Sequence, residues 1–366
     1  MSAINKFIKQ HPNLFASLKL IFFLYIFFFS LDLMGSSVKL FGEGFAETII
    51  ASTSNPLVGL FIGILATSII QSSSSTTSIV VGMVAGGVLD INGAIPIIMG
   101  ANIGTSITNT IAALPQINRS VEFKRAFAAA TVHDFFNFLS VLIIYPLQVT
   151  TNFLGIISEK LEIAFTGVGG LNILSPVKAI TKPIVHFFTN NLGDYPWLLL
   201  VLALVVLFIA LKFMVGSLKL MVVAKAQNWF DKYLFKNALR AFFVGVFLTV
   251  LVQSSSITTS LMVPLAGAGI LTLKKIFPYT LGANIGTTVT ALLAALITGS
   301  QAAVTVAFSH LLFNISGIVI WAPFSKVPIY LAEKFAELSI KNKMIPVAYI
   351  LIMFFVIPIS VIFIFN

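Results

Sequence analysis

The sequence predicts an all-α polytopic membrane protein with two inverted-topology repeats, each containing a re-entrant broken-helix hairpin whose tip carries a Gln-Ser-Ser-Ser motif. The first observation is composition: 58% of the 366 residues are hydrophobic and only 9% are charged, against about 25% charged in an ordinary soluble domain. The second is that apolar stretches of about 20 residues recur, which is the length of a helix that crosses a bilayer. The third is an internal duplication.

The duplication is visible in two pairs of segments. QSSSSTTS at 71–78 returns as QSSSITTS at 253–260, and GANIGTSIT at 100–108 returns as GANIGTTVT at 282–290. Both pairs are separated by 182 residues, so the spacing inside each half is the same. Two near-identities at one offset indicate that each half is a copy of one structural unit.

A third pair, HDFFN at 133–137 and HLLFN at 310–314, follows after a connection that is five residues shorter in the second half. The pairs divide the chain into an N-terminal helix with the first repeat, an outer connection, a second repeat, and a C-terminal part with a surface helix and a final span. These parts cover residues 1–146, 147–195, 196–323 and 324–366, and the two hairpins cover about 57–89 and 239–271.

The distribution of basic residues predicts that the halves are inverted. Residues 34–55 carry Lys39 with two acids, whereas the corresponding segment 216–240 carries five basic residues and one acid. Cytoplasmic loops are enriched in Lys and Arg, so the first segment is expected outside and the second in the cytoplasm. The N-terminus, with Lys6 and Lys9, is then cytoplasmic, and the expected location is the cell (inner) membrane.

From that start the elements follow in order, each predicted by an apolar run of membrane length. The first run, 15–33, has no small-residue cleavage site, so it is interpreted as a membrane helix and not as a removed signal. The mixed charge of 325–343 predicts an amphipathic helix on the cytoplasmic surface. The remaining predicted spans are 93–113, 126–146, 197–215, 277–297, 302–322 and 344–365.

The two Gln-Ser-Ser-Ser tips are expected within the membrane. In the first hairpin, 57–70 and 76–89 contain 14 residues each, and ~21 Å of helix is too short to cross. Ser and Thr are good N-cap residues, and a helix N-terminus offers free N–H donors to an anion. Hydroxyl-rich stretches also let membrane helices pack closely, but two copies, each led by Gln, favour a binding site where the repeats meet.

No Arg lies inside any predicted span, so a bound anion needs another ion to neutralise its charge. The GANIG motifs offer neutral oxygens for that ion, with Thr side chains one helical turn apart on one face. Amide and hydroxyl oxygens suit a hard cation such as Na⁺ and not a transition metal; close packing at the glycines is the alternative. The motif residues concerned are Asn102, Thr105, Thr108, Asn284, Thr287 and Thr290.

Asp134 is an acid within an apolar run, and the second half has Leu311 at the matching position. A carboxylate inside a membrane is costly and indicates a functional site, here a cation site present in one repeat; a structural pair with His133 or with a neighbouring helix is the alternative. Asn137 and Asn314 are placed to add ligands. For His133 and its counterpart in the second half, the matched positions favour a shared hydrogen-bonding role over a proton relay.

These motifs resemble the type II sodium–phosphate cotransporters, in a bacterial form because the outer connection has no cysteine. The resemblance rests on the two tips, the two GANIG motifs and the segment RAFAAATVHDFFNFLSV at 125–141, and it covers both repeats. It implies sodium-driven symport of inorganic phosphate by alternating access. Ala128, Ala130 and Asp134 match the Ala-x-Ala-x-x-x-Asp pattern of electrogenic members, which implies an additional sodium ion at the carboxylate.

The resemblance also implies ligands. Two departures place parts of the set in doubt: Asn118 stands where the family usually has Asp, and Ala101 and Ala283 stand where it often has Ser. The residues expected to bind phosphate are Gln71, Ser72, Ser73, Gln253, Ser254, Ser255, Thr105 and Arg119. Those expected to bind sodium, from the resemblance and the pattern together, are Asp134, Asn137, Gln116, Thr287, Thr290, Asn102, Asn284 and Asn314.

The chain is expected not to be an enzyme and to use no cofactor, with Na⁺ as its coupling ion. Its expected partners are phosphate, sodium and the lipid bilayer, with no nucleic acid. Two alternatives stay open: an anion channel or exporter that ignores sodium and, less favoured, an intramembrane enzyme with a serine nucleophile. Adjacent His133 and Asp134 lie about 100° apart on a helix, which disfavours the relay that such an enzyme needs. Association into a homodimer is also left open.

Overall fold

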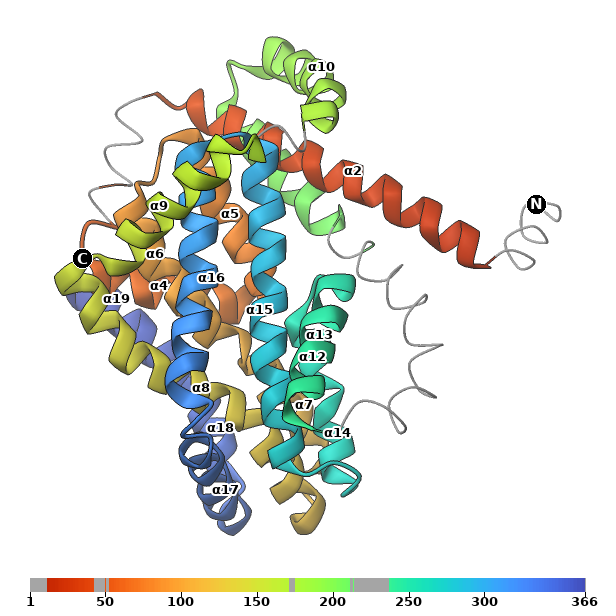
Figure 1. Cartoon of the computed structure of the whole chain (residues 1–366), viewed down its shortest axis with the longest axis vertical. Coiled ribbons are helices and arrows are strands. Elements are labelled where there is room, and N and C mark those ends of the chain that lie inside the picture. Colours follow the sequence, from red (N-terminus) through yellow and green to blue (C-terminus); the bar gives the residue numbers. More distant parts are fainter. Residues whose placement is uncertain are drawn as a thin grey trace.

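The computed structural model describes residues 12–42, 50, 53–170, 175–210, 213 and 237–365, and all regular structure within these ranges is helical. Figure 1 shows α15 and α16 running along the long axis of the molecule, with α5 seen between them, α4 and α6 on the side of α16, and α12, α13 and α14 on the side of α15. The predicted all-α fold class is confirmed. The basic segment 216–236 and the N-terminal lysines, on which the predicted orientation depends, lie outside the described residues.

Six helices in these ranges are long and apolar enough to cross a membrane, which confirms a polytopic membrane protein. Five of them are Ser17–Lys39, Ile91–Gln116, Ser120–Thr151, Leu273–Thr298 and Gln301–Trp321. The sixth, Met344–Phe365, is the most apolar, and only 11% of an 18-residue stretch of it is buried inside the molecule. Because lipid tails are as apolar as such side chains, this last span is suited to the edge of the bundle.

The first half contains two short helices, then a span in two pieces, then a long span. The predicted outer connection continues as helix. The elements of this part are α2 (Pro12–Lys39), α4 (Pro56–Ile70), α5 (Ser73–Gly86), α6 (Ile91–Thr105), α7 (Ile107–Ala113), a 3₁₀ turn at Leu114–Gln116, α8 (Ser120–Thr151), α9 (Phe153–Gly167) and α10 (Ser175–Leu192).

The second half repeats this order and is followed by the amphipathic helix and the last span. It opens with a helix at Pro196–Ala210. The elements that follow are α12 (Ala238–Val252), α13 (Ser255–Ser260), α14 (Met262–Gly267), α15 (Leu273–Thr298), α16 (Gln301–Trp321), α17 (Lys326–Lys341), α18 (Met344–Leu351), a π-helical turn at Ile352–Val356 and α19 (Ile357–Phe365).

Two helices that hydropathy predicts as continuous are interrupted. The predicted span 93–113 divides at Ser106, whose hydroxyl donates to the carbonyl of Ile103 at 2.7 Å and so competes with the helical ladder. In the second hairpin, α13 and α14 divide at Leu261. Pro264 follows within one turn, and a proline removes a backbone donor and crowds the carbonyl four residues before it.

Glycines bring the outer arm of each hairpin into backbone contact with the next span. A Cβ on Gly100 of α6 would lie 1.9 Å from the carbonyl oxygen of Leu60 in α4, and a Cβ on Gly282 of α15 would lie 1.9 Å from that of Phe242 in α12. No larger residue could come this close. Both members of this contact recur at the offset of 182 residues, so the duplicated sequence folds into duplicated packing.

The two halves also meet each other at equivalent positions. α8 and α16 cross where Ser140 lies against Gly317, and these residues correspond in the two halves. Likewise α8 contacts α15 as its counterpart α16 contacts α6. Equivalent surfaces of the two halves therefore face each other. In Figure 1, α16 descends to α17 at the bottom of the view, whereas α8 starts near the bottom and rises to α9.

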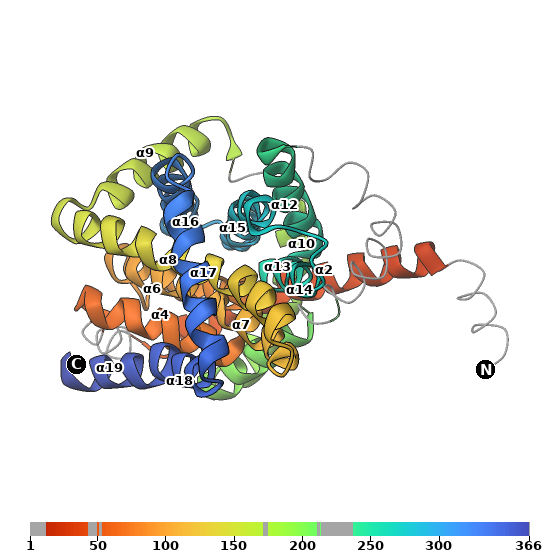
Figure 2. The same cartoon turned by 90° about the horizontal axis from the view of Figure 1, so that it is seen from below.

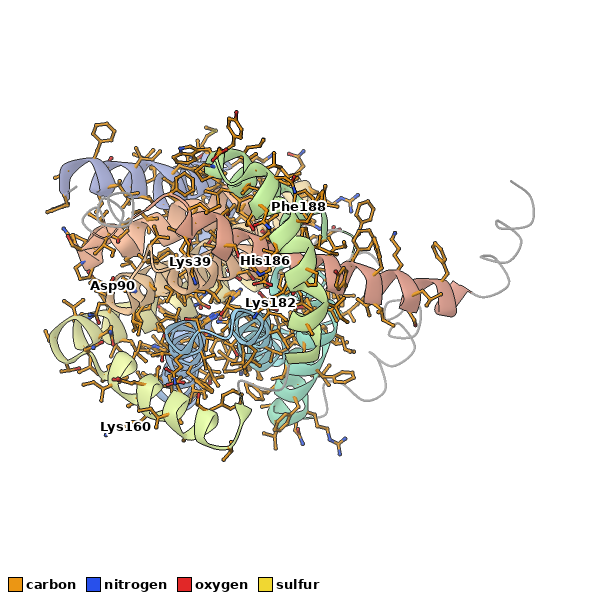
Figure 3. The ribbon with its side chains drawn as sticks, turned by 90° about the horizontal axis from the view of Figure 1, so that it is seen from above. Lys39, Asp90, Lys160, Lys182, His186 and Phe188 are labelled. Atoms are coloured by element: carbon orange, nitrogen blue, oxygen red, sulfur yellow. The ribbon has the colours of Figure 1, made fainter. Side chains whose placement is uncertain are left out.

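Charged side chains lie at both ends of this bundle. Seen from above, Lys39, Asp90, Lys160 and Lys182 lie at the end that carries α9 and α10 (Figure 3). Figure 2, seen from below, shows α17 across the opposite end, beside α7, α8 and α18. The buried faces of α17 include Ala332 and Ala336, while polar residues cover much of its other side, as the sequence predicts for an amphipathic surface helix.

Candidate functional site

Both Gln-Ser-Ser-Ser motifs form sharp breaks between two helices. Gln71 follows α4 with φ of 57°, and Gln253 follows α12 with φ of 54°, a left-handed conformation that is uncommon for residues other than glycine. The next residue caps the following helix: the hydroxyl of Ser72 accepts from the backbone N–H of Ser75 at 3.2 Å, and Ser254 does the same at the second break. The predicted helix break is therefore present in both halves.

A pair of threonine hydroxyls joins the arms of each break. Thr67 donates to Thr76 at 3.0 Å in the first half, and Thr249 and Thr258 lie 2.8 Å apart in the second. All four side chains are buried. The repeat offset relates the two pairs, but the sequence did not predict them. A sequence alone does not show which hydroxyls face each other across a turn.

The two breaks lie together in the centre of the molecule. Ser74 of the first tip donates its hydroxyl proton to the backbone carbonyl of Gln253 in the second at 3.2 Å. The side-chain carbonyl of Gln253 accepts from Thr290 at 2.6 Å, and Ser73 and Ser255, the first residues of α5 and α13, are each 3% exposed. This hydrogen bond joins the two tips, and of the six predicted tip residues Gln71 is the exposed one.

A chain of amide and imidazole groups crosses the interface between the halves. Asn109 lies 3.4 Å from Nδ1 of His133, whose Nε2 lies 2.7 Å from Oδ1 of Asn284. Asn284 donates to Asn137 at 3.0 Å, and Asn137 donates to the backbone carbonyl of Asn102 at 2.7 Å. The predicted cation ligands Asn102, Asn137 and Asn284 are therefore neighbours, although they are far apart in the sequence.

These contacts fix the histidine as a neutral hydrogen-bonding group. The amide nitrogen of Asn109 can only donate, so Nδ1 of His133 accepts and Nε2 carries the proton that goes to Asn284. The reciprocal contact joins His310 to Asn102 at 3.4 Å. Nδ1 of His310 has no partner among the described residues, because Ala291 stands where the first half has Asn109. The predicted hydrogen-bonding role of both histidines is confirmed.

Asp134 does not pair with His133, and its hydrogen-bond partners lie on neighbouring helices, as the structural alternative also allows. It is fully buried, and Oδ2 accepts from the hydroxyl of Tyr349 at 2.8 Å and from that of Thr110 at 3.2 Å. Its other oxygen, Oδ1, has no partner in the described part of the chain. Tyr349 belongs to the final span and has no repeat counterpart, so no pattern in the sequence indicated this contact.

Some of the predicted sodium ligands carry buried oxygen atoms without a hydrogen-bond partner among the described residues. Besides Oδ1 of Asp134, Oδ1 of Asn314 is buried without a partner among the residues that the structure describes. Thr105 and Thr287 each donate to the carbonyl four residues earlier, which leaves their oxygen lone pairs available. Within the same residues there is no group of three or more His, Cys, Asp or Glu side chains that could hold a metal, and hard neutral oxygens with one carboxylate suit Na⁺ better than a transition metal.

The structure does not bring Arg119 to either tip. Its guanidinium pairs with Glu122 at 3.0 Å, and its side chain is 74% exposed. Gln116 ends the 3₁₀ turn just before it, and its buried Oε1 has no partner in the described ranges. Both residues were predicted as ligands from a family pattern. In the structure Gln116 has an oxygen available to a ligand, whereas Arg119 forms an ion pair at the surface.

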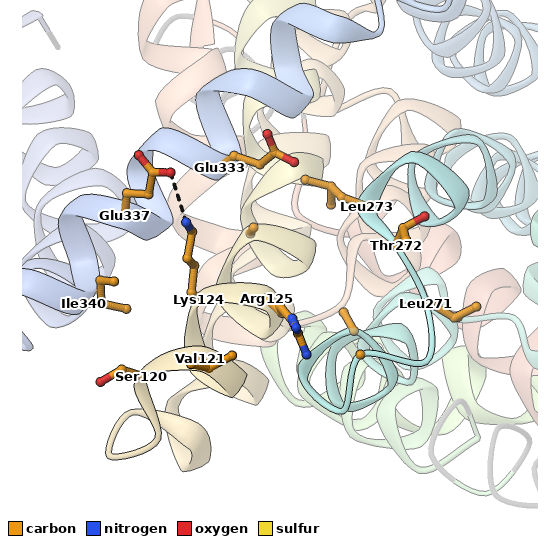
Figure 4. A pocket seen from close by; sticks show the side chains of 13 residues that line it. Ser120, Val121, Lys124, Arg125, Leu271, Thr272, Leu273, Glu333, Glu337 and Ile340 are labelled. Atoms are coloured by element: carbon orange, nitrogen blue, oxygen red, sulfur yellow. Dashed lines mark hydrogen bonds and ion pairs between the residues drawn. The ribbon is translucent and has the colours of Figure 1, made fainter.

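A hollow of about 710 Å³ opens at this end of the molecule, between α8, α17 and the turn after α14 (Figure 4). Lys124 and Glu337 form an ion pair across it at 3.0 Å, and Lys334 binds the same carboxylate at 2.8 Å. The hydrogen bonds from Lys334 and Lys124 lower the pKa of Glu337 to about 2. The ion pair joins the surface helix α17 to the long span α8.

A family model described as Na+/Pi-cotransporter matches residues 26–172 and 206–356. The chain belongs to the Na+/Pi-cotransporter family. Each matched range contains one Gln-Ser-Ser-Ser tip and one GANIG motif, and the second extends to include Tyr349. The resemblance that the motifs indicated is confirmed.

Named relatives agree with this family. The chain is 36% identical to sodium-dependent phosphate transport protein 2B of Homo sapiens over 93% of its own length, and 35% identical to protein 2A of Rattus norvegicus over 92%. It spans 64% and 65% of the lengths of these two relatives. No solved structure matches the chain.

Proposed function

We propose that this protein is a sodium-coupled symporter of inorganic phosphate, which it binds between its two Gln-Ser-Ser-Ser tips. The observation that carries the proposal is the contact between the tips, Ser74 to Gln253 at 3.2 Å, in a member of the Na+/Pi-cotransporter family. The relatives named above are sodium-dependent phosphate transport proteins by name. The chain acts as a transporter and not as an enzyme.

The tips offer phosphate neutral donors from two directions. α5, with 14 residues, begins at Ser73, and a helix N-terminus carries about +0.5 charge with free N–H donors. The second tip adds the hydroxyls of Ser254 and Ser255. No arginine is among the described contacts of either tip, and we propose that co-transported cations neutralise the anion.

Sodium ions supply that neutralisation. Asp134 offers a buried oxygen without a partner, held in place by Tyr349 and Thr110 through its other oxygen. The asparagine chain lies between the two halves, so an ion held by it contacts both. Binding of the anion and of the cations then depends on the same interface, and this couples the two fluxes. An additional ion at the carboxylate, beyond those that balance the phosphate charge, makes the cycle electrogenic.

Inverted repeats provide the alternating access. The reciprocal contacts between α8 and α16, their opposite directions in Figure 1, and the excess of basic residues in the predicted cytoplasmic segments all support a two-fold axis in the membrane plane. Rocking of one half against the other would expose the shared site to each side in turn. The hairpins are then re-entrant, the N-terminus is cytoplasmic, and the protein lies in the inner membrane; a homodimer stays a prediction.

The test is radiolabelled phosphate uptake into proteoliposomes that contain the purified full chain. With an inward sodium gradient we expect concentrative uptake, and with sodium replaced by potassium we expect uptake to fall to the level of protein-free liposomes. A membrane potential that is negative inside should accelerate uptake, because each net positive charge carried inward gains ~2.3 kcal/mol per 100 mV. Equal uptake in sodium and potassium would instead establish the anion channel or exporter.

A further inference from the structure

A second hollow, of about 770 Å³, lies away from the tips between α12, α15, α16 and the start of α17. Its walls are apolar, with Phe242, Phe277, Leu281 and Ile318 among the lining residues. Its lining comes from the beginnings of α12, α15 and α17 and from the end of α16, so the groove lies where two membrane-length spans end. We call it the α12–α16 groove.

The first half has the same groove, but there it is filled. The repeat offsets relate the walls of the α12–α16 groove to Leu60, Ile95, Met99 and Val141. These four residues form one buried core with Ile350 and Phe354 of the final span. In the second half, Phe277 and Leu281 are buried in a core with Ile329 and Ala332 of α17. Phe242 and Ile318 stay partly exposed, and they line the groove that the final span does not reach in this half.

One end of the groove is basic. Lys274 lies in the first turn of α15, and Lys326 begins α17 directly after the end of α16. Both line the groove, both are exposed, and neither forms a hydrogen bond or ion pair with another described residue. Glu333 is the single acid in the lining. The two ammonium groups stand where two spans end, which is the level of lipid head groups.

We infer that the α12–α16 groove is a binding site for an anionic phospholipid. One acyl chain lies along the apolar walls, and the phosphate of the head group lies between Lys274 and Lys326. Basic pockets between helices at the cytoplasmic side of a membrane bind such head groups. A second copy of the chain fits less well, because a two-fold interface here would bring the same two lysines of each copy together.

The experiment uses the full chain in nanodiscs of phosphatidylcholine mixed with phosphatidylglycerol. The protein is released from the nanodiscs in the mass spectrometer, and the lipids that stay bound to it are counted. We expect the wild type to retain phosphatidylglycerol in preference to phosphatidylcholine. The double variant Lys274→Gln/Lys326→Gln should lower that retention by roughly tenfold or more, since each basic residue near a membrane surface contributes measurably to binding anionic lipid. Lys275→Gln is the matched control, because Lys275 neighbours Lys274 on α15 but does not line the groove.

A second variant tests the groove itself. Ala322, exposed at the end of α16, corresponds to Tyr145, which packs against the core of the first half. Ala322→Tyr should therefore fill the groove and reduce retention of both lipids. Equal retention of the two lipids by the wild type would overturn the inference, as would equal losses in Lys275→Gln and the double variant. The inference would also be overturned if the released protein were a dimer without bound lipid and Ala322→Tyr made it a monomer. The occupant of the groove would then be a second copy of the chain.

Discussion

Replacing Asp134 by asparagine is expected to leave the protein folded and to abolish its sodium-driven transport current. Asparagine has the same shape, and its carbonyl can accept from Tyr349 and Thr110 as Oδ2 does in the wild type. What is lost is the negative charge on the buried oxygen that has no protein partner. A cycle that loses this coupled ion loses ~2.3 kcal/mol of driving force per 100 mV, so uptake becomes electroneutral or stops.

The measurement is phosphate-induced current in proteoliposomes or in cells, at matched amounts of protein. Asp90→Asn is the control, because Asp90 caps α6 at the surface by accepting from the N–H of Gly93 at 2.9 Å, and asparagine caps about as well as aspartate. The control should keep its full current. If Asp134→Asn carries the same current per phosphate as the wild type, the carboxylate does not bind a coupling ion.

Replacing Gly282 by alanine is expected to prevent correct folding. The added Cβ would lie 1.9 Å from the carbonyl oxygen of Phe242 and 3.0 Å from the backbone nitrogen of Val246, and backbone atoms cannot turn away as a side chain can. α12 and α15 would have to separate, which breaks the hairpin arm from its supporting span. Overpacking a core costs 1–3 kcal/mol and occasionally more, and this contact belongs at the upper end, at about 3 kcal/mol or above.

Folded yield and the midpoint of thermal unfolding, both read from size-exclusion chromatography after heating, measure the effect. Gly35→Ala in α2 is the control, because its Cβ would meet only one atom, at 3.9 Å, and alanine is the better helix former by about 1 kcal/mol. Gly100→Ala should behave as Gly282→Ala does, since the same contact recurs in the first half. A stable, monodisperse Gly282→Ala protein would show that the helices do not pack backbone to backbone.

The sequence predicts the fold class and both helix breaks because duplication turns weak local signals into strong ones. A glutamine before three serines in an apolar region could simply aid helix packing, but its recurrence at Gln71 and Gln253 marked two breaks that the structure confirms. The same repeat pairing placed His133 and His310 in matching roles. Features that recur in both repeats can therefore be predicted from the sequence.

Features that break the repeat could not be predicted in this way. Tyr349 reaches Asp134 from outside both halves, and Asn109 has an alanine as its counterpart, so no pairing singles out either residue. Helix interruptions at Ser106 and before Pro264 depend on local hydrogen bonding and ring geometry within otherwise continuous apolar runs. Arg119 was predicted at the phosphate site from a motif. In the structure it instead forms an ion pair with Glu122 at the surface.

The central claim is that one anion is held jointly by the two tips. The most direct measurement is the position of arsenate, a heavy analogue of phosphate, from its anomalous scattering in crystals of the protein grown with sodium and arsenate. We predict one anomalous peak for arsenate, in contact with both Ser73 and Ser255. A peak that touches a single tip, or that lies beside Arg119 with none between the tips, would contradict it.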